Sequence, residues 1–153
     1  MKVIKGDLIS LFQNGEFDVI VHGCNAHCTM GSGIARSIRE AYPIAYEVDC
    51  QTKKGDRSKL GSFTVASVVN PMNKEAQYII NAYTQYDYNP RVLQVDYKAL
   101  RRCFKNIKSA YSGKRIAYPA IGCGLAGGDW NVVSKIIDEE LAGEDHTFVI
   151  YQK

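Results

Sequence analysis

The sequence has neither a strong excess of one charge nor a long apolar run. Its 153 residues include 19 Lys and Arg against 16 Asp and Glu, for a net charge of +3. This mild balance is unlike the clustered charge of a nucleic-acid-binding domain. No stretch approaches the roughly 20 apolar residues that a membrane-spanning helix needs, so we expect no membrane partner. Hydrophobic residues at 46% are ordinary for a globular protein, and we expect one domain over residues 1–153.

Cysteines are present in an odd number, five, and no leader-like segment precedes them. The chain opens directly on a strand pattern, MKVIKGDLIS. Free thiols in a reducing cytoplasm explain this better than a disulfide framework. Two basic groups, at 53–59 and 101–108, are interpreted as a solvated loop and a solvated helix face. We expect a cytoplasmic monomer.

Two kinds of site are disfavoured by what is missing. There is no GxxxxGK[ST] segment, so we do not expect a triphosphate P-loop. His22, Cys24, His27 and Cys28 are metal-ligand types, but their spacing is not a C-x2-C or H-x3–5-H pattern. We therefore expect no metal and no cofactor.

Strand and helix patterns alternate along the chain. The unbroken run from Val19 to Val21 is typical of a strand buried on both faces. The alternation predicts an α/β fold with a largely parallel central sheet between helices on both sides. The expected strands are 3–5, 17–23, 63–69, 78–83, 115–121 and 147–151, and the expected helices are 8–12, 34–42, 93–111 and 130–141. Asp7 and Asp129 are candidate N-caps, and Pro43 marks a helix end.

Two glycine-rich loops, at 23–33 and 122–128, each follow a predicted buried strand and precede a helix. Glycines allow a close backbone approach, and a helix start adds free N–H groups that suit phosphate. One such loop is usually only a tight turn. Two at the carboxyl edge of one sheet predict a diphosphate held from both sides.

Four segments taken together, VIKGDLI, VHGCNAHCTMGSGIA, PAIGCGLAGGDW and FVIYQK, resemble the macrodomain family over essentially the whole chain. The similarity is greatest to the yeast-type ADP-ribose-1″-phosphate phosphatases, the terminal ADP-ribose protein glycohydrolases and short stand-alone phage macrodomains. It implies a three-layer α/β/α fold with a mixed, largely parallel sheet. It also implies ADP-ribose or a derivative as ligand, either free or on a macromolecule.

The resemblance assigns roles by position. Asp7 and Leu8 match the adenine contacts, Asn25 the distal-ribose contact, and Tyr151 a stacking residue. The two phosphate turns correspond to Gly31, Ser32, Gly33 and Ile34, and to Gly122, Cys123, Gly124, Leu125, Ala126 and Gly127. Three of these residues also have a structural interpretation: Asp7 as a helix cap, which is compatible with an adenine contact, Asn25 as a turn former, and Tyr151 as an edge-strand residue packed on the core.

His22 is implied as a catalytic residue together with Asn25. It would act as a general base toward water or steady the substrate phosphate. The alternative is a core histidine bonded to a backbone carbonyl. Cys123 lies where a thiol pKa could fall, although a small packing residue explains it as well.

The sequence departs from the protein glycohydrolase pattern at two positions. Gln85 stands where that class has Lys, and Ala126 where it has Asp; the nearest carboxylate is Asp129. A Lys nucleophile is therefore missing there, and removal of the 1″-phosphate is the favoured reaction. The alternatives are a non-catalytic ADP-ribose reader or sequestering module, and a hydrolase of ADP-ribosyl groups on macromolecules. Tyr83, Tyr86 and Tyr88, in the 73–89 region, would line the distal pocket or only pack.

Overall fold

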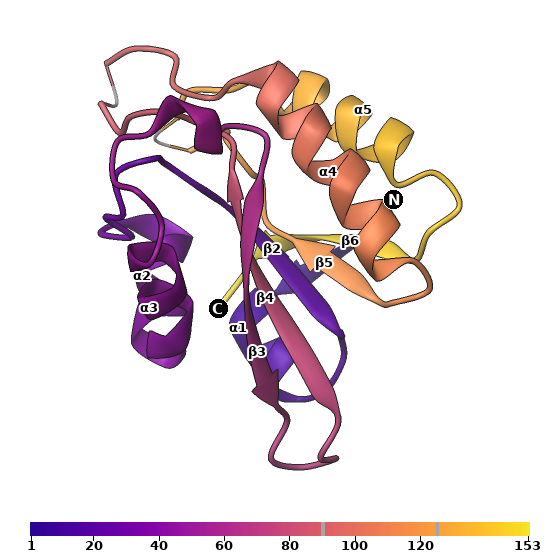
Figure 1. Ribbon diagram of the computed structural model, residues 1–153. Helices are drawn as coiled ribbons and strands as arrows, with labels where there is room; N and C mark the ends of the chain where they lie inside the picture. The colour runs from indigo at the N-terminus through magenta and orange to yellow at the C-terminus, as the bar shows by residue number, and fades with distance from the viewer. Residues whose placement is uncertain (90, 125) are drawn as a thin grey trace.

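The computed structural model describes residues 1–89, 91–124 and 126–153. A six-stranded sheet runs through the middle of the molecule in the order β1-β6-β5-β2-β4-β3 (Figure 1). Neighbouring strands are parallel except β3, which is antiparallel to β4, so the sheet is mixed and largely parallel as predicted. The strands are β1 (Lys2–Gly6), β2 (Val19–Cys24), β3 (Phe63–Val69), β4 (Ala76–Tyr83), β5 (Ile116–Tyr118) and β6 (His146–Tyr151).

Helices cover both faces of the sheet, which confirms the three-layer α/β/α arrangement (Figure 1). One face carries α1 (Leu8–Gln13), α2 (Gly33–Ala41) and α3 (Pro43–Cys50). The other carries α4 (Tyr97–Tyr111) and α5 (Trp130–Glu140), and a 3-10 turn, η1, spans Arg57–Lys59. Each side has its own hydrophobic core: Phe12, Ile20, Ile38 and Ile79 lie in one, and Val21, Leu100, Phe104 and Ile137 in the other.

The central strand β2 is buried along its length except at Gly23. Its residues alternate between the two cores because successive side chains of a strand point to opposite faces. That explains the unbroken apolar run in the sequence. The strand ends at Cys24, where the first glycine-rich loop begins.

Capping residues and a proline mark several of the helix ends in the sequence. The Asp7 side chain accepts from the amides of Ile9 and Ser10, and Asp129 accepts from the amide of Asn131, so both N-caps are confirmed. Pro43 does follow the end of α2, but it also begins α3, a helix that the sequence analysis missed. Proline suits a first helical position because that N–H has no intrahelical partner.

Two predicted elements are shorter than expected. The helix expected from Leu93 begins at Tyr97, because Asp96 caps it by accepting from the amide of Ala99. Leu93 itself is exposed and outside the helix. The strand expected over 115–121 is regular only over Ile116–Tyr118. The chain beyond it turns into the second glycine-rich loop.

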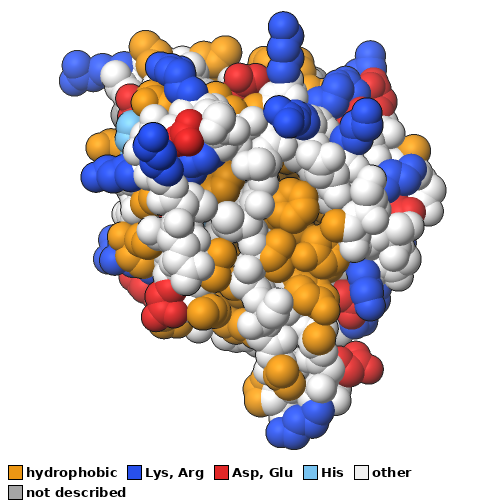
Figure 2. Space-filling view, in the orientation of Figure 1, with side chains coloured by type: hydrophobic (Ala, Val, Ile, Leu, Met, Phe, Trp, Pro, Cys, Tyr) orange, Lys and Arg blue, Asp and Glu red, His pale blue; other side chains and the backbone are white. Residues whose placement is uncertain are grey.

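Lys and Arg side chains lie mainly along the edges of the face in Figure 2, while hydrophobic side chains gather near its middle. On α4, Arg101 forms ion pairs with Glu139 and Glu140 on α5, so this basic side chain is paired with the neighbouring helix. No helix among the described residues is long and apolar enough to cross a membrane.

Candidate functional site

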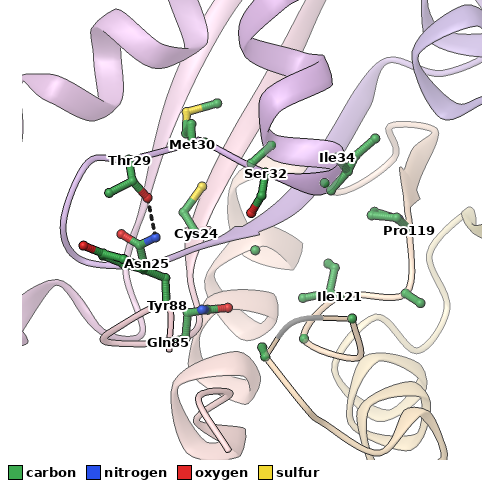
Figure 3. Close-up of a pocket in the computed structure, with 18 of the residues that line it drawn as sticks. Cys24, Asn25, Thr29, Met30, Ser32, Ile34, Gln85, Tyr88, Pro119 and Ile121 are labelled. Atoms are coloured by element: carbon green, nitrogen blue, oxygen red, sulfur yellow. Dashed lines mark hydrogen bonds between the residues drawn. The ribbon is translucent and has the colours of Figure 1, made fainter. Parts of the chain in front are cut away.

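A cleft of about 430 Å³ opens at the carboxyl ends of the central strands β5, β2 and β4 (Figure 3). It lies where open α/β sheets place their ligands, and its volume is in the range of small-molecule sites. The first loop forms one wall and the second loop forms the other. Both predicted loops therefore face the same cavity, lined by Gly23, Cys24, Asn25, Thr29 to Ala35, Asp49, Gln85, Tyr88, Pro119 to Gly122, Gly124 and Ala126.

The first loop is held in a strained, well-anchored shape. Cys28 and Met30 have positive φ angles, as does Gly33, and strained backbone at non-glycine residues clusters at functional sites. Asn25 accepts from the amide of His27 at 2.8 Å and donates to Thr29 Oγ1 at 2.7 Å (Figure 3). Asn25 is thus a turn former, and it also lines the cleft.

The first loop leads into α2, whose first backbone amides donate no hydrogen bond to the N-cap side chain. Ser32 occupies the N-cap position, yet its side chain makes no capping hydrogen bond in the described structure. The first amides of α2 are therefore available to an anion, and the helix dipole favours negative charge there. Gly31, Ser32, Gly33 and Ile34 all line the cleft, as the phosphate-turn prediction requires.

The second loop needs glycine for both its conformation and its packing. Gly122 has φ +72°, and a Cβ there would lie 2.6 Å from Val95 Cγ2. The amide of Gly128 closes the turn on the carbonyl of Gly122 at 2.7 Å. Gly122, Gly124 and Ala126 line the cleft, Gly127 lies beside them in the turn, and Leu125 lies outside the described residues.

The helix after this loop offers no open start, because Asp129 caps it with its own carboxylate. Phosphate would therefore meet the backbone of the loop rather than the end of α5. Cys123 does not line the cleft and donates its thiol proton to the carbonyl of Ile121. Burial and the nearby charge of Asp129 raise the pKa of this thiol to about 11, so the fall suggested by its position does not occur.

The predicted adenine contacts lie on the same edge of the sheet, outside the cleft lining. Gly6 at the end of β1 pairs with Tyr151 at the end of β6, which brings Asp7 and Leu8 close to Tyr151. Strand β6 separates β1 from β5, so these residues lie beyond the Pro119 end of the cleft. Tyr151 is 70% exposed and on an inner strand, so the alternative of an edge-strand residue packed on the core is wrong.

His22 is fully buried and does not line the cleft. Its Nε2 lies 2.7 Å from Asn81 Oδ1. The Asn81 amide nitrogen donates to the carbonyl of Ala45, so its oxygen must be the acceptor and His22 Nε2 carries the proton. The partner is a side-chain amide, not the backbone carbonyl expected of a core histidine. Burial lowers the pKa of His22 to about 4, which keeps the ring neutral.

The structure adds a residue that the sequence analysis did not single out. Asp49, in the last turn of α3, lines the cleft although only 1% of it is exposed. Its Oδ1 accepts from the hydroxyl of Tyr83 at 2.7 Å. The sequence signal was weak, since nothing near Asp49 marks it as different from an exposed helical carboxylate.

The three tyrosines of the 73–89 region separate into different roles. Tyr83 is buried and bonds Asp49, Tyr86 packs edge-on against His27 and donates to the carbonyl of Gly55, and Tyr88 lines the cleft. The carbonyl of Tyr86 accepts from the amide of Ala26, which ties this segment to the first loop. Residues 70–75 form the β3–β4 turn at the far end of the sheet (Figure 1).

Sequence comparisons identify the family. A family model described as the Macro domain matches residues 21–137. A phage T4 protein, the "uncharacterized 17.5 kDa protein in tk-vs intergenic region", is 37% identical over 90% of this chain and 88% of its own. The chain therefore belongs to the Macro domain family.

More distant relatives carry names that bear on function. The ADP-ribose glycohydrolase OARD1 of Bos taurus is 27% identical over 97% of this chain and 88% of its own. The structure of Thermosipho africanus DarTG in complex with ADP-ribose superposes with a TM-score of 0.75 at 19% identity. The structural alignment covers 99% of this chain and 41% of the DarTG chain, and this similarity supports the assignment of the fold. Within the described residues, no group of three or more His, Cys, Asp or Glu side chains is placed to hold a metal ion.

Proposed function

We propose that this protein binds ADP-ribose derivatives in the cleft and hydrolyses the bond at their distal end, with ADP-ribose-1″-phosphate as the best substrate. The observation that carries the proposal is the meeting of two separate glycine-rich turns across one cavity. The open start of α2 and the Gly122 turn would hold the diphosphate from opposite sides. Asn25, at one end of the same cleft, would then contact the distal ribose.

The adenine would extend from the Pro119 end toward Asp7, Leu8 and Tyr151. An exposed tyrosine there supports stacking, because its ring is free to meet a base. The Asp7 Oδ1 atom is occupied by two helix amides, so its second oxygen is the one offered to the adenine amino group. This arrangement puts the reacting bond at the Asn25 end.

His22 would act as a positioning residue in this reaction. A fully buried, neutral ring bonded to Asn81 does not reach water in the cleft. It supports the polar side chains behind the first loop instead. The rate enhancement would come from orientation of the distal ribose and from backbone N–H groups facing developing charge.

A second candidate is removal of ADP-ribosyl groups from macromolecules, and the name of the OARD1 relatives favours it. Gln85 and Ala126 occupy the positions where the protein glycohydrolases have their Lys and Asp, and both line the cleft. The chemistry would therefore need another base. Both candidates share one binding mode and differ in the bond that is hydrolysed: the phosphorus–oxygen bond in the phosphatase, and the bond between the 1″ carbon and the macromolecule in the glycohydrolase.

The test is turnover with two substrates. Purified protein is incubated with ADP-ribose-1″-phosphate, and separately with an ADP-ribosyl-glutamate protein, and release of phosphate or ADP-ribose is followed. We expect phosphate release that falls strongly in Asn25→Ala and His22→Ala. Asn106→Ala, an exposed change on α4, is the matched control. Phosphate release that survives both site substitutions would contradict the assigned roles, and tight ADP-ribose binding without any turnover would establish a binding module instead.

A further inference from the structure

Asp49 is a buried carboxylate on the wall of the cleft. Carboxylates are almost never fully buried unless paired, yet the one donor to Asp49 in the described structure is the neutral hydroxyl of Tyr83, on Oδ1. No described group donates to Oδ2. An asparagine could accept the same hydrogen bond without the cost of burying a charge. The charge of the buried Lys59 offsets part of that cost, but within the described structure it forms no ion pair with Asp49, whose position on the cleft wall offers it a ligand.

The surroundings of Asp49 make it a better base than an ordinary aspartate. Burial raises the pKa of its carboxyl, while the Tyr83 hydrogen bond and the charge of Lys59 oppose the rise. It also lies in the last turn of α3, where the helix dipole disfavours negative charge. The other titratable groups around it are Cys24 on β2, Cys28 in the first loop and Tyr46 on α3 itself.

A chain of hydrogen bonds holds this carboxylate in one orientation. Asn81 donates to Thr64 Oγ1 at 3.1 Å, and Thr64 lies 3.1 Å from the Tyr83 hydroxyl. Because the Tyr83 proton goes to Asp49, Thr64 must donate to Tyr83. The chain begins at His22, whose ring donates to Asn81. His22 is thus linked to the cleft through Asn81, Thr64, Tyr83 and Asp49, and its ring also lies 3.6 Å from the thiol of Cys24, which lines the cleft.

We propose that Asp49 is the general base of the cleft and faces the distal ribose. This inference rests on the proposed hydrolase function. Asp49 accepts one proton from a water molecule as the water oxygen forms a bond to the phosphorus of the 1″-phosphate. The bond between phosphorus and the ribose 1″ oxygen breaks, and its electron pair stays on that oxygen. The carboxylic acid then returns the proton to it, giving ADP-ribose, inorganic phosphate and a regenerated carboxylate.

The decisive variant is Asp49→Asn, which keeps the shape and the Tyr83 hydrogen bond but loses the base. We expect kcat for phosphate release to fall by about 10² to 10⁴. The melting temperature does not separate a catalytic from a structural role, because the variant removes a buried charge and also the charge that faces the buried Lys59. The wild-type rate should rise with pH through the Asp49 pKa, and the variant should lack that limb. Glu47→Gln, an exposed acid-to-amide change on the same helix, is the matched control.

A purely structural Asp49 predicts turnover close to wild type in Asp49→Asn and an unchanged dependence of the rate on pH. An active wild type with an Asp49→Asn variant retaining its kcat overturns this inference and leaves the proposed function intact. If the wild type releases neither phosphate nor ADP-ribose, the proposed function fails, and the base role fails with it.

Calorimetry tests the placement without any turnover. ADP-ribose has a distal ribose and ADP has none, so Asp49→Asn should weaken ADP-ribose binding by about tenfold or more through loss of a charged hydrogen bond. Binding of ADP should not change. Equal effects on both ligands, or no effect on either, would overturn the position of Asp49 at the distal ribose.

Discussion

Acid should destabilise this protein through His22. The pKa of this buried ring is about 4 in the folded protein because of desolvation, against about 6.5 for a histidine in an unfolded chain. Folding therefore favours the neutral ring. The resulting stability is complete above pH 6.5 and is lost as the pH falls toward 4, because the unfolded chain binds the proton first.

The size of the effect follows from that difference in pKa. The full loss is about 3 kcal/mol, and linkage gives a loss of about 2 kcal/mol between pH 7 and pH 5. For a domain of this size, this corresponds to a fall in melting temperature of about 4 to 8 °C. Two other groups also make stability depend on pH: burial lowers the pKa of His146, whereas it raises the pKa of Asp49, whose protonation acts in the opposite direction.

The assay isolates His22 by difference. Urea unfolding is measured from pH 5 to 8 for the wild type and for His22→Gln, and the two pH slopes are subtracted. We expect the wild type to lose about 2 kcal/mol more than the variant over pH 7 to 5. In the same wild-type protein, the NMR signals of the His22 ring should not titrate above pH 5. Parallel slopes, or a His22 titration near pH 6.5, would refute the burial and hydrogen bonding described for this ring.

Two further predictions concern the phosphate turns. Ser32→Asp should cap α2 and raise the free energy of unfolding by about 0.5 to 1 kcal/mol. It should also lower the affinity for ADP-ribose at least about tenfold, because the new carboxylate occupies the place of a phosphate. Thermal melts measure the first effect and calorimetry the second, and an unchanged affinity would contradict the anion site. Gly122→Ala should cost more stability than Gly113→Ala: both have positive φ, but only Gly122 would place its Cβ against Val95. Only Gly122→Ala should weaken ADP-ribose binding, and equal melting temperatures for the two variants would contradict the packing.

Much of the fold could be predicted from local signals. The buried run at Val19 to Val21 and the Asp7 and Asp129 caps are visible in the sequence, because they depend on neighbours in the chain. The missed α3 shows the limit of such signals. Pro43 can end one helix and begin the next, and the burial of Ala45 and Asp49 on one side of α3 depends on parts of the chain that local signals do not include.

Some features of the candidate site could likewise be predicted from the sequence, and others could not. Glycine-rich loops after strands could be placed at one edge, because parallel strands end together. The environment of Asp49 could not be predicted, because it depends on Tyr83, which is 34 residues away. The burial of His22 likewise depends on Asn81, its partner across the β2–β4 pairing. Both contacts join segments that the sequence gives no reason to pair.

The most direct test of the account is a crystal structure of the protein with ADP-ribose. We predict the diphosphate between the amides at the start of α2 and the turn at Gly122, with the distal ribose beside Asn25 and Asp49. A diphosphate bound outside this cleft, or a ligand reversed so that adenine lies beside Asn25, would contradict it.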